Sequence, residues 1–465
     1  MKRPNILLIM TDEHAPMFSG TYGHPLVQTP CMDQLAAEGV TFDNAYCNSP
    51  LCLPSRMSFM TGRYISRIGA YDNASPLPSD AVTWAHRLRA VGYDVVLSGK
   101  QHFCGPDQLH GFREQLARDL HAEMWTRSGV PCGTADWSKG TPPAANPWGV
   151  VAAAGPGTTL EIEVDDLVEE RALEYLRDPE RKAQPWALNV SFIAPHFPLV
   201  VPARFFDLYP LDQIDMPEIP PGHLDKQHPV HKRMRSMFGA VDFPDEQVRR
   251  ARAAYYGLIT YMDEKIGRLL QVLEETGQRD NTVVVHFSDH GEMNGEHGMW
   301  RKSSFYEASS RVPLQIVWPG QIAAGQRLAE VVSLVDLVAT VVDMADAPTV
   351  ATLDGDSLLG LMQGQDEDWK DEAFCEYLAH GVARPMAMLR KGRYKLNYSL
   401  GDAPELYDIE ADPNEFDDLA GDVTHASTLA DLQEQLLSRW APVTLEAHVL
   451  QSQQERLLIE QAAKE

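Results

Sequence analysis

The sequence predicts an α/β fold, with a mixed, largely parallel sheet between helices and a smaller C-terminal α+β domain. Short apolar runs alternate with longer amphipathic stretches over most of the chain. This alternation is typical of a largely parallel sheet that helices cover on both faces. After about Trp369 the pattern changes to short strands and a polar tail with helical periodicity. Residues 1–368 are therefore predicted to form the large catalytic domain, and residues 369–465 the smaller domain.

The first predicted element is a buried strand. Residues 6–10 form an apolar run that stops at Asp12, too short for a signal peptide and without a small-residue cleavage site. No segment approaches the roughly 18 uninterrupted apolar residues that a membrane-spanning helix needs. The remaining patterns of the large domain predict, in chain order, helices over 32–38 and 82–91, strands over 93–98 and 187–193, a helix over 255–275, and strands over 282–287 and 314–318.

Two irregular stretches interrupt this pattern. Residues 129–157 are rich in Gly, Pro and Ala and are predicted to form a long loop or insertion over the carboxyl ends of the strands. A second irregular stretch covers residues 210–229. Long loops in compact domains are more often functional than accidental. In the smaller domain we expect strands over 386–390 and 394–399 and a helical tail from about Ala426.

The charge balance limits the partners of this chain. Its 465 residues include 40 Lys and Arg against 66 Asp and Glu, a formal charge of −26, which argues against nucleic-acid and anionic-membrane binding. An anionic substrate would therefore need a local positive pocket. The six cysteines, at positions 31, 47, 52, 104, 132 and 375, show no CxxC pair. Neither a disulfide framework nor a zinc ribbon is indicated, and we expect reduced thiols in a cytoplasmic protein.

Polar residues follow three of the predicted strands. One strand ends at Asp12, a second leads into Asp289, and a third leads into His196. In parallel α/β sheets, ligands gather beyond the carboxyl ends of the strands. Carboxylate oxygens bind Ca²⁺ and Mg²⁺, and Mn²⁺ also accepts imidazole. Asp12, Glu13, Asp289 and His290 are thus predicted to hold one divalent metal ion, with Ca²⁺ our first choice and Mn²⁺ or Mg²⁺ the alternatives.

The most informative stretch is Cys-Leu-Pro-Ser-Arg at positions 52–56, followed by Gly62. It resembles the Cys-x-Pro-Ser-Arg signature of type I sulfatases, in which a formylglycine-generating enzyme oxidises the cysteine to formylglycine. The resemblance implies a hydrated aldehyde at Cys52 that carries two hydroxyls on one carbon. One oxygen would bind the metal and attack sulfur, and the other would later expel sulfate.

Further residues match the same family. Lys100 and His102 stand in its Gly-Lys-x-His element, His196 in its Pro-His element, and Lys302 in the place of the lysine that follows the last metal segment. Cationic groups around a sulfate stabilise the charge that develops on its oxygens. The resemblance implies that His196 and Lys302 face the leaving oxygen. The sulfate and the formylglycine would be positioned by the other polar side chains: Arg56, Lys100, His102 and Asn73.

Residues 4 to about 420 together resemble a formylglycine sulfatase of the alkaline phosphatase superfamily. The resemblance is closest to the choline sulfatase and phosphonate monoester hydrolase branch, and it implies an alkaline-phosphatase-like fold. The two metal segments of the family usually read Asp-Asp and Asp-Asn, whereas this chain has Asp-Glu at 12–13 and Asp-His at 289–290. The identity of the metal is therefore open. We also expect a homo-oligomer.

The implied substrate is a small anionic sulfate ester. Choline sulfate would need an aromatic wall and carboxylates around its quaternary ammonium, and Trp125, Trp148 and Glu376 are the candidates. Members that bind choline usually have a longer C-terminal tail and often show Cys-x-Ala-x-Arg in place of Cys-x-Pro-Ser-Arg. Another alkyl or aryl sulfate is therefore an open alternative.

Two other functions are also open. A phosphonate monoester or phosphodiester hydrolase would use the same machinery, because a singly charged tetrahedral diester resembles a sulfate monoester in shape and charge. That group shares His290 with this chain. The other alternative is a non-catalytic binding protein on the same fold. The intact Cys52, Arg56 and Lys100 argue against it, whereas a missing aldehyde would favour it.

Overall fold

The computed structural model describes residues 3–120, 147–237, 242–348, 352–365 and 368–462. Its main sheet has eight strands: β1 (Asn5–Asp12), β2 (Val40–Tyr46), β3 (Asp94–Gly99), β4 (Glu114–Gln115), β6 (Trp186–Pro195), β8 (Thr282–Ser288), β9 (Leu314–Val317) and β10 (Gln326–Ser333). Their order is β10-β2-β9-β8-β1-β6-β3-β4. Strand β9 is antiparallel to β2 and β8, and the other neighbouring pairs are parallel. The predicted mixed, largely parallel sheet is confirmed.

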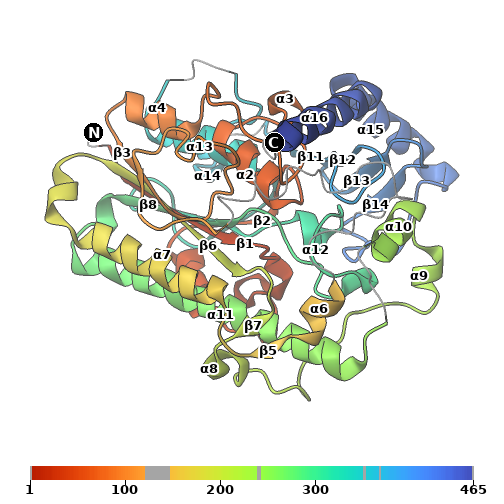
Figure 1. The fold of residues 1–465 in the computed structure, drawn as a ribbon, viewed down its shortest axis with the longest axis horizontal. Coiled ribbons are helices and arrows are strands. Elements are labelled where there is room, and N and C mark those ends of the chain that lie inside the picture. Colours follow the sequence, from red (N-terminus) through yellow and green to blue (C-terminus); the bar gives the residue numbers. More distant parts are fainter. Residues whose placement is uncertain (1–2, 121–146, 238–241, 349–351, 366–367, 463–465) are drawn as a thin grey trace.

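Helices cover both faces of this sheet (Figure 1). One face carries α1 (Pro30–Glu38), α7 (Leu160–Arg177) and α11 (Asp245–Glu275), and the other carries α2 (Cys52–Thr61), α4 (Trp84–Ala90) and α13 (Leu334–Met344). Strand β1 shows why both layers form. Leu7 and Ile9 belong to the core of the first layer, whereas Ile6, Leu8 and Met10 belong to the core of the second. Because successive side chains of a strand point to opposite faces, an uninterrupted apolar run needs cover on both sides.

The remaining helices are shorter or lie towards the end of the chain. The α-helices are α3 (Ile65–Ile68), α6 (Pro147–Ala152), α8 (Ala203–Phe206), α9 (His223–Lys226), α10 (Pro229–Met237), α12 (Glu307–Ser310), α14 (Leu359–Met362), α15 (Ala426–Arg439) and α16 (Pro442–Ala462). The 3-10 helices are η1 (Pro16–Phe18), η2 (Gly20–Tyr22), η4 (Pro179–Ala183), η5 (Arg279–Asn281), η6 (Glu296–Gly298) and η7 (Val423–His425).

A separate antiparallel sheet follows in the C-terminal part, as predicted. Its strands, in spatial order, are β11 (Glu372–Tyr377), β12 (Met386–Lys391), β13 (Tyr394–Ser399) and β14 (Glu405–Asp408). Apolar side chains of this sheet and of α15 share one core with α2 and α13. The smaller sheet is therefore packed onto the layer that carries residue 52. The domain boundary at residues 368 and 369 stays a prediction.

The structure adds elements that the sequence pattern did not indicate. Strands β2 and β10 were not predicted; in β10 the first five residues alternate between exposed and partly buried, and polar residues interrupt the apolar run. Of the predicted loop over 129–157, residues 129–146 lie outside the described part. Its later residues form α6 and the strand β5 (Gly155–Pro156), which pairs with β7 (Val200–Val201). The stretch over 210–229 is irregular except for α9 and the start of α10.

Among the described helices, none combines the length and the apolar character that crossing a membrane requires. The cytoplasmic location stays a prediction.

Candidate active site

Four elements meet where the central strands end. Strand β1 ends at Asp12, β8 leads into Asp289, β3 leads into Lys100, and α2 begins at Cys52. Strands β8, β1, β6 and β3 are consecutive and parallel, so their last residues lie along one edge of the sheet. Residues that are distant in the sequence thereby reach one site.

Cys52 lies in a group of buried metal-ligand side chains. Its Sγ is 3.3 Å from His290 Nε2 and 3.9 Å from Asp12 Oδ1. His290 Nε2 is in turn 3.7 Å from Asp12 Oδ1 and 3.8 Å from Asp289 Oδ1. One ligand atom of each of these four residues lies within 4.8 Å of the others. Two carboxylates and one imidazole suit a divalent cation, so this set fits the metal site that the sequence predicts.

Arg56 orients the two carboxylates of this group. Its buried guanidinium holds Asp12 Oδ2 at 2.9 Å and Asp289 Oδ2 at 2.7 Å, and Lys100 Nζ lies 2.6 Å from the same Asp12 Oδ2. Arg56 also donates to the Lys100 carbonyl at 2.6 Å and to Ser191 Oγ at 2.8 Å. Because the Oδ2 atoms are held by cations, the Oδ1 atoms are left on the side of His290 and Cys52.

Glu13 belongs to a second group, with Asp12 and His196. Its Oε2 is 2.7 Å from Lys302 Nζ and 3.1 Å from His196 Nε2, and its Oε1 is buried without a hydrogen-bond partner among the described residues. Glu13 has a φ of 64°, which is uncommon for a residue with a β-carbon. Burial raises the pKa of its carboxyl to about 7, although Lys302 and His196 act to lower it. Its role as a metal ligand stays a prediction.

The site favours an anion at position 52. Burial acts to raise the pKa of the Cys52 thiol, but Lys302, Lys100 and His290 outweigh it and hold that pKa well below its usual value. Cys52 is also the first residue of α2, and helix N-termini stabilise negative charge. A chain with a net charge of −26 thus places three cationic side chains, those of Arg56, Lys100 and Lys302, around this site.

Two predicted histidines lie near these charged side chains, His102 beside Cys52 and His196 beside Glu13. His102 is buried with a φ of 62°, and its backbone N–H donates to Asp119 Oδ2 at 2.5 Å. His196 follows β6; its Nδ1 is 2.6 Å from the carbonyl oxygen of Phe197. Lys302 Nζ lies 5.1 Å from the centre of the Phe197 ring, so this ring packs beside both His196 and Lys302.

Asn73 lies beside the first turn of α2. Its Oδ1 accepts a hydrogen bond from the backbone N–H of Leu53 at 3.0 Å, and Leu53 is the second residue of α2. In the described contacts, Asn73 therefore holds the start of the helix that carries Cys52. Direct contact with sulfate stays a prediction.

Of the three residues predicted to bind choline, the structure describes the side chain of Glu376 alone. Trp125 and the side chain of Trp148 lie outside the described residues. Glu376 is fully buried, and its Oε2 accepts a hydrogen bond from the backbone N–H of Ser66 at 3.1 Å. Burial raises the pKa of the Glu376 carboxyl to about 7. This carboxyl is thus engaged with the start of α3, and a choline pocket stays a prediction.

Sequence reasoning missed three residues near the site. Asp119 and Ser191 hold the backbone of His102 and the side chain of Arg56, and no motif marks either of them. His380 is buried with a φ of 69°, and its carbonyl accepts from Tyr377 at 2.6 Å. Within the described part of the chain, its Nδ1 has no hydrogen-bond partner. Burial, and then Arg301, lower the pKa of His380 to about 4. Lys302 and Cys52 also act on that pKa, but nothing in the sequence distinguishes this histidine from the other 15.

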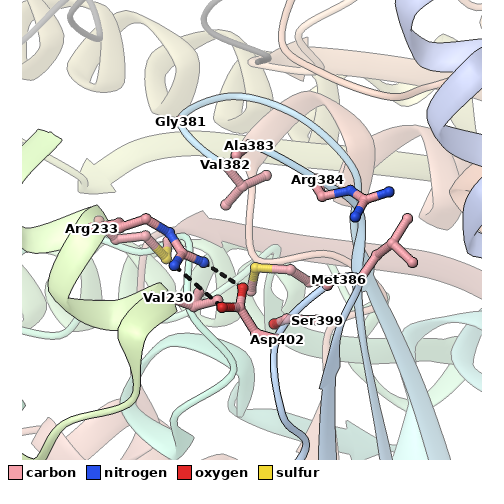
Figure 2. Close-up of a pocket in the computed structure, with 12 residues that line it drawn as sticks. Val230, Arg233, Gly381, Val382, Ala383, Arg384, Met386, Ser399 and Asp402 are labelled. Carbon is pink, nitrogen blue, oxygen red and sulfur yellow. Dashed lines mark hydrogen bonds and ion pairs between the residues drawn. The ribbon is translucent and has the colours of Figure 1, made fainter. Parts of the chain in front are cut away.

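A cavity of about 290 Å³ borders the segment that follows His380 (Figure 2). It lies between α10 and the β12 and β13 strands, and Arg233 forms an ion pair with Asp402 at its edge. The rest of its lining is largely apolar: Val230, Met234, Val382, Ala383, Met386 and Leu400. None of the residues around Cys52 lines this cavity, so the two sites are distinct.

Comparison with known proteins gives the same assignment as the geometry. Residues 4–347 match the family model described as Sulfatase, and residues 295–441 match that described as N-sulphoglucosamine sulphohydrolase, C-terminal. A choline-sulfatase of Rhizobium meliloti is 36% identical over 484 residues, covering 99% of this chain and 92% of the relative. A multifunctional alkaline phosphatase superfamily protein of Trinickia caryophylli is 30% identical, covering 94% and 95%.

Solved structures are similar to this chain over nearly its whole length. The phosphonate monoester hydrolase of Agrobacterium radiobacter superposes with a TM-score of 0.76 at 26% identity, covering 96% of each chain. The match of the family model, over residues 4–347, includes Asp12, Cys52 and Asp289, and the relatives cover nearly the whole chain. The chain therefore belongs to the sulfatase family, within the alkaline phosphatase superfamily, and is a sulfuric ester hydrolase.

Proposed function

We propose that this protein hydrolyses a small alkyl or aryl sulfate monoester, using a formylglycine formed from Cys52 and one divalent metal ion. The observation that carries the proposal is the position of Cys52 Sγ. It lies 3.3 Å from His290 Nε2, inside the buried set formed with Asp12 and Asp289. A formylglycine-generating enzyme would carry out the maturation, and the homo-oligomeric state stays a prediction.

The residues around position 52 divide into two groups by charge. When present, the formylglycine hydrate supplies the attacking oxygen and the metal ion supplies positive charge beside it. Asp12, Asp289 and His290 would hold the ion, and Arg56 keeps both carboxylates oriented. Lys100 and His102 lie on the cationic side and would bind sulfate oxygens, where preorganised positive groups stabilise developing charge.

Lys302 and His196 would face the leaving oxygen. Burial acts to lower the pKa of Lys302, but Cys52 and Glu13 raise it above its usual value. Lys302 is therefore a cation at neutral pH. Burial, and then Lys302, lower the pKa of His196 to about 4, so its imidazole is neutral and carries one N–H, which Nδ1 donates to the Phe197 carbonyl. We assign charge stabilisation of the leaving oxygen to Lys302, and positioning of Lys302 to His196, through Glu13, which contacts both.

One experiment tests the nucleophile and the reaction together. The mass of the peptide that contains Cys52 is measured in purified protein, and the same protein is assayed with aryl sulfates, alkyl sulfates and choline sulfate at equal concentration. We expect the aldehyde form of residue 52 and release of inorganic sulfate. An unmodified thiol together with an inactive protein would contradict the proposal and favour the non-catalytic alternative.

Hydrolysis of phosphonate monoesters or phosphodiesters is the second candidate function. It is favoured by the superposition on a phosphonate monoester hydrolase and by the position of His290 Nε2 against Cys52 Sγ. Phenyl phosphonate esters and phosphodiesters therefore belong in the same panel. A larger kcat/KM for these esters than for every sulfate tested would make this the main activity.

Choline sulfate is one member of the panel because of the 36% identity to a choline-sulfatase. The described contacts of Glu376 do not point to a choline site, since its carboxyl accepts from Ser66. The panel decides between choline sulfate and other alkyl or aryl sulfates.

A further inference from the structure

A buried ion pair joins the last helix to the active-site side of the protein. Arg456, in α16, donates from Nη1 and Nη2 to the two carboxylate oxygens of Asp72 at 2.6 and 2.8 Å. Only 6% of the Arg456 side chain and 1% of the Asp72 side chain are exposed. Figure 1 shows α16 beside the segment around α3 that precedes Asp72. Bidentate charged pairs of this kind fix geometry as well as adding stability.

The carboxylate of Asp72 also organises its own turn. Its Oδ1 accepts from the backbone N–H of Ala74 at 2.9 Å and from Ser75 Oγ at 3.1 Å. Ser75 Oγ in turn accepts from the backbone N–H of Tyr71 at 3.1 Å. Burial acts to raise the pKa of Asp72, but Arg456 and these hydrogen bonds lower it below its usual value. Asp72 is thus an ionised group that connects the turn to Arg456.

The next residue in this turn, Asn73, caps the helix that carries the nucleophile. Its Oδ1 accepts from the Leu53 N–H at 3.0 Å, and the residue at the N-cap position of α2, Leu51, provides no side-chain hydrogen bond. The first N–H groups of a helix need acceptors from outside the helix. Asn73 supplies one such acceptor next to Cys52. The position of this turn therefore affects the position of the first turn of α2.

We propose that Arg456 is a positioning residue for the reaction: it holds the turn around Asp72, through which Asn73 fixes the start of α2 and with it Cys52. The inference rests on the proposed function of Cys52, and it makes the activity dependent on the last helix of the chain. Lys100, the cation that would bind sulfate oxygens, does not belong to this turn. Loss of Arg456 should thus lower kcat and leave KM nearly unchanged.

The test uses Arg456→Met, which keeps an apolar stem without the charge, and Arg456→Lys, which keeps a charge without the bidentate fork. The measured quantities are kcat, expressed per formylglycine-containing chain, and KM, both for an aryl sulfate. We expect kcat of Arg456→Met to fall by about tenfold or more, since small misplacement of a reacting group can cost up to 10²-fold. Arg456→Lys should recover part of the loss.

A second, more exposed ion pair on α16 provides a control for the attachment of this helix. Arg384 donates from Nε and Nη2 to the carboxylate of Glu446 at 2.8 and 3.0 Å, also bidentate and also tying α16 to the body of the protein. Glu446→Gln breaks this pair without touching the turn around Asp72. We expect its kcat and KM to equal those of the unaltered protein, whatever the change in the midpoint of thermal unfolding.

A double variant separates positioning from general destabilisation. If Arg456 acts through Asn73, the kcat of Arg456→Met combined with Asn73→Ala should be no lower than that of the worse single variant. Unchanged kcat in Arg456→Met, an equal loss in Glu446→Gln, or fully additive losses in the double variant would each overturn the inference. If the unaltered protein hydrolyses only phosphonate esters, the proposed function fails, and the same comparison on those esters still tests Arg456.

Discussion

Cys52 combines a reactive position with a small structural role. It starts a helix in which every residue is buried, yet one thiol contributes little to that packing. Cys52→Ala should abolish turnover, a loss of about 10³-fold or more, and leave the fold intact. Cys52→Ser should also be severely impaired, because a sulfated serine has no second hydroxyl to expel sulfate. Turnover and circular dichroism check both expectations, and appreciable hydrolysis by folded Cys52→Ala would exclude this nucleophile.

His196 and Lys302 should differ from the sulfate-binding residues in their dependence on the leaving group. Both lie within 3.1 Å of the same oxygen of Glu13. Replacing either by Ala should lower kcat/KM by about 10²–10³-fold for an alkyl sulfate, and by less than about tenfold for an aryl sulfate, whose phenolate needs little help to leave. Equal losses on both substrates would show that these residues only bind sulfate. Lys100→Ala is the comparison, with similar losses expected on both.

At the scale of elements, the ends of β1 and β8 supply the two aspartates of the predicted metal site. Asp12 and Asp289 each give one oxygen to Arg56 and leave the other on the side of Cys52 and His290. We expect about one divalent ion per chain, a reversible loss of activity with a chelator, and metal content near zero in Asp289→Asn. Elemental analysis of the purified protein measures this. Protein that is fully active without stoichiometric metal would contradict the assignment.

Asp263→Asn is the matched control for the metal prediction. Asp263 is also a buried aspartate, on α11, but its carboxylate accepts from the backbone N–H groups of Cys31 and Met32 at 2.8–3.1 Å. The metal content of the Asp263→Asn variant should equal that of the unaltered protein.

At the scale of the whole molecule, a buried cluster ties the smaller sheet to the large domain. Lys395 Nζ, in β13, is 2.9 Å from Glu307 in α12 and 2.8 Å from Glu415, with Lys395 fully buried. Removing one partner of a buried pair leaves an uncompensated charge, so Lys395→Met should lower the free energy of unfolding by about 3–5 kcal/mol. Arg393 is half-exposed and pairs with Asp408. Replacing it by Ala should lower the free energy of unfolding by much less, because solvent screens an exposed ion pair. Urea titration of both variants compares them, and similar losses would mean that the cluster adds no special stability.

The same cluster predicts a pH dependence of stability. Burial, opposed in part by Lys395, raises the pKa of Glu415 from 4.5 to about 7. Between these values the folded protein holds a proton that the unfolded chain has lost, so this group makes stability fall as the pH rises from about 4.5 to 7. Glu415→Gln should flatten that part of the profile of unfolding midpoint against pH. An unchanged slope would show that Glu415 is ionised in the folded protein throughout this range.

Sequence alone determined those features that depend on local pattern. The apolar runs of β1, β6 and β8 read as buried strands because both faces of each are covered, and the residues at their ends could be named in advance. The Cys-x-Pro-Ser-Arg motif identified Cys52 and Arg56 for the same reason: five adjacent positions carry the signal. Edge strands such as β10 were not predicted, because an edge strand is only partly buried and keeps polar residues.

Only the tertiary structure decided which distant groups act on one another. Several contacts depend on side-chain directions across several strands. Arg56 holds the Oδ2 atoms of Asp12 and Asp289. Glu13 pairs with Lys302 and His196, and Glu376 contacts Ser66. No periodicity encodes those directions. The ion pair of Asp72 with Arg456, 384 residues away, is the extreme case: each residue alone reads as an ordinary surface charge, and only the packing of α16 against the body of the protein buries the two together.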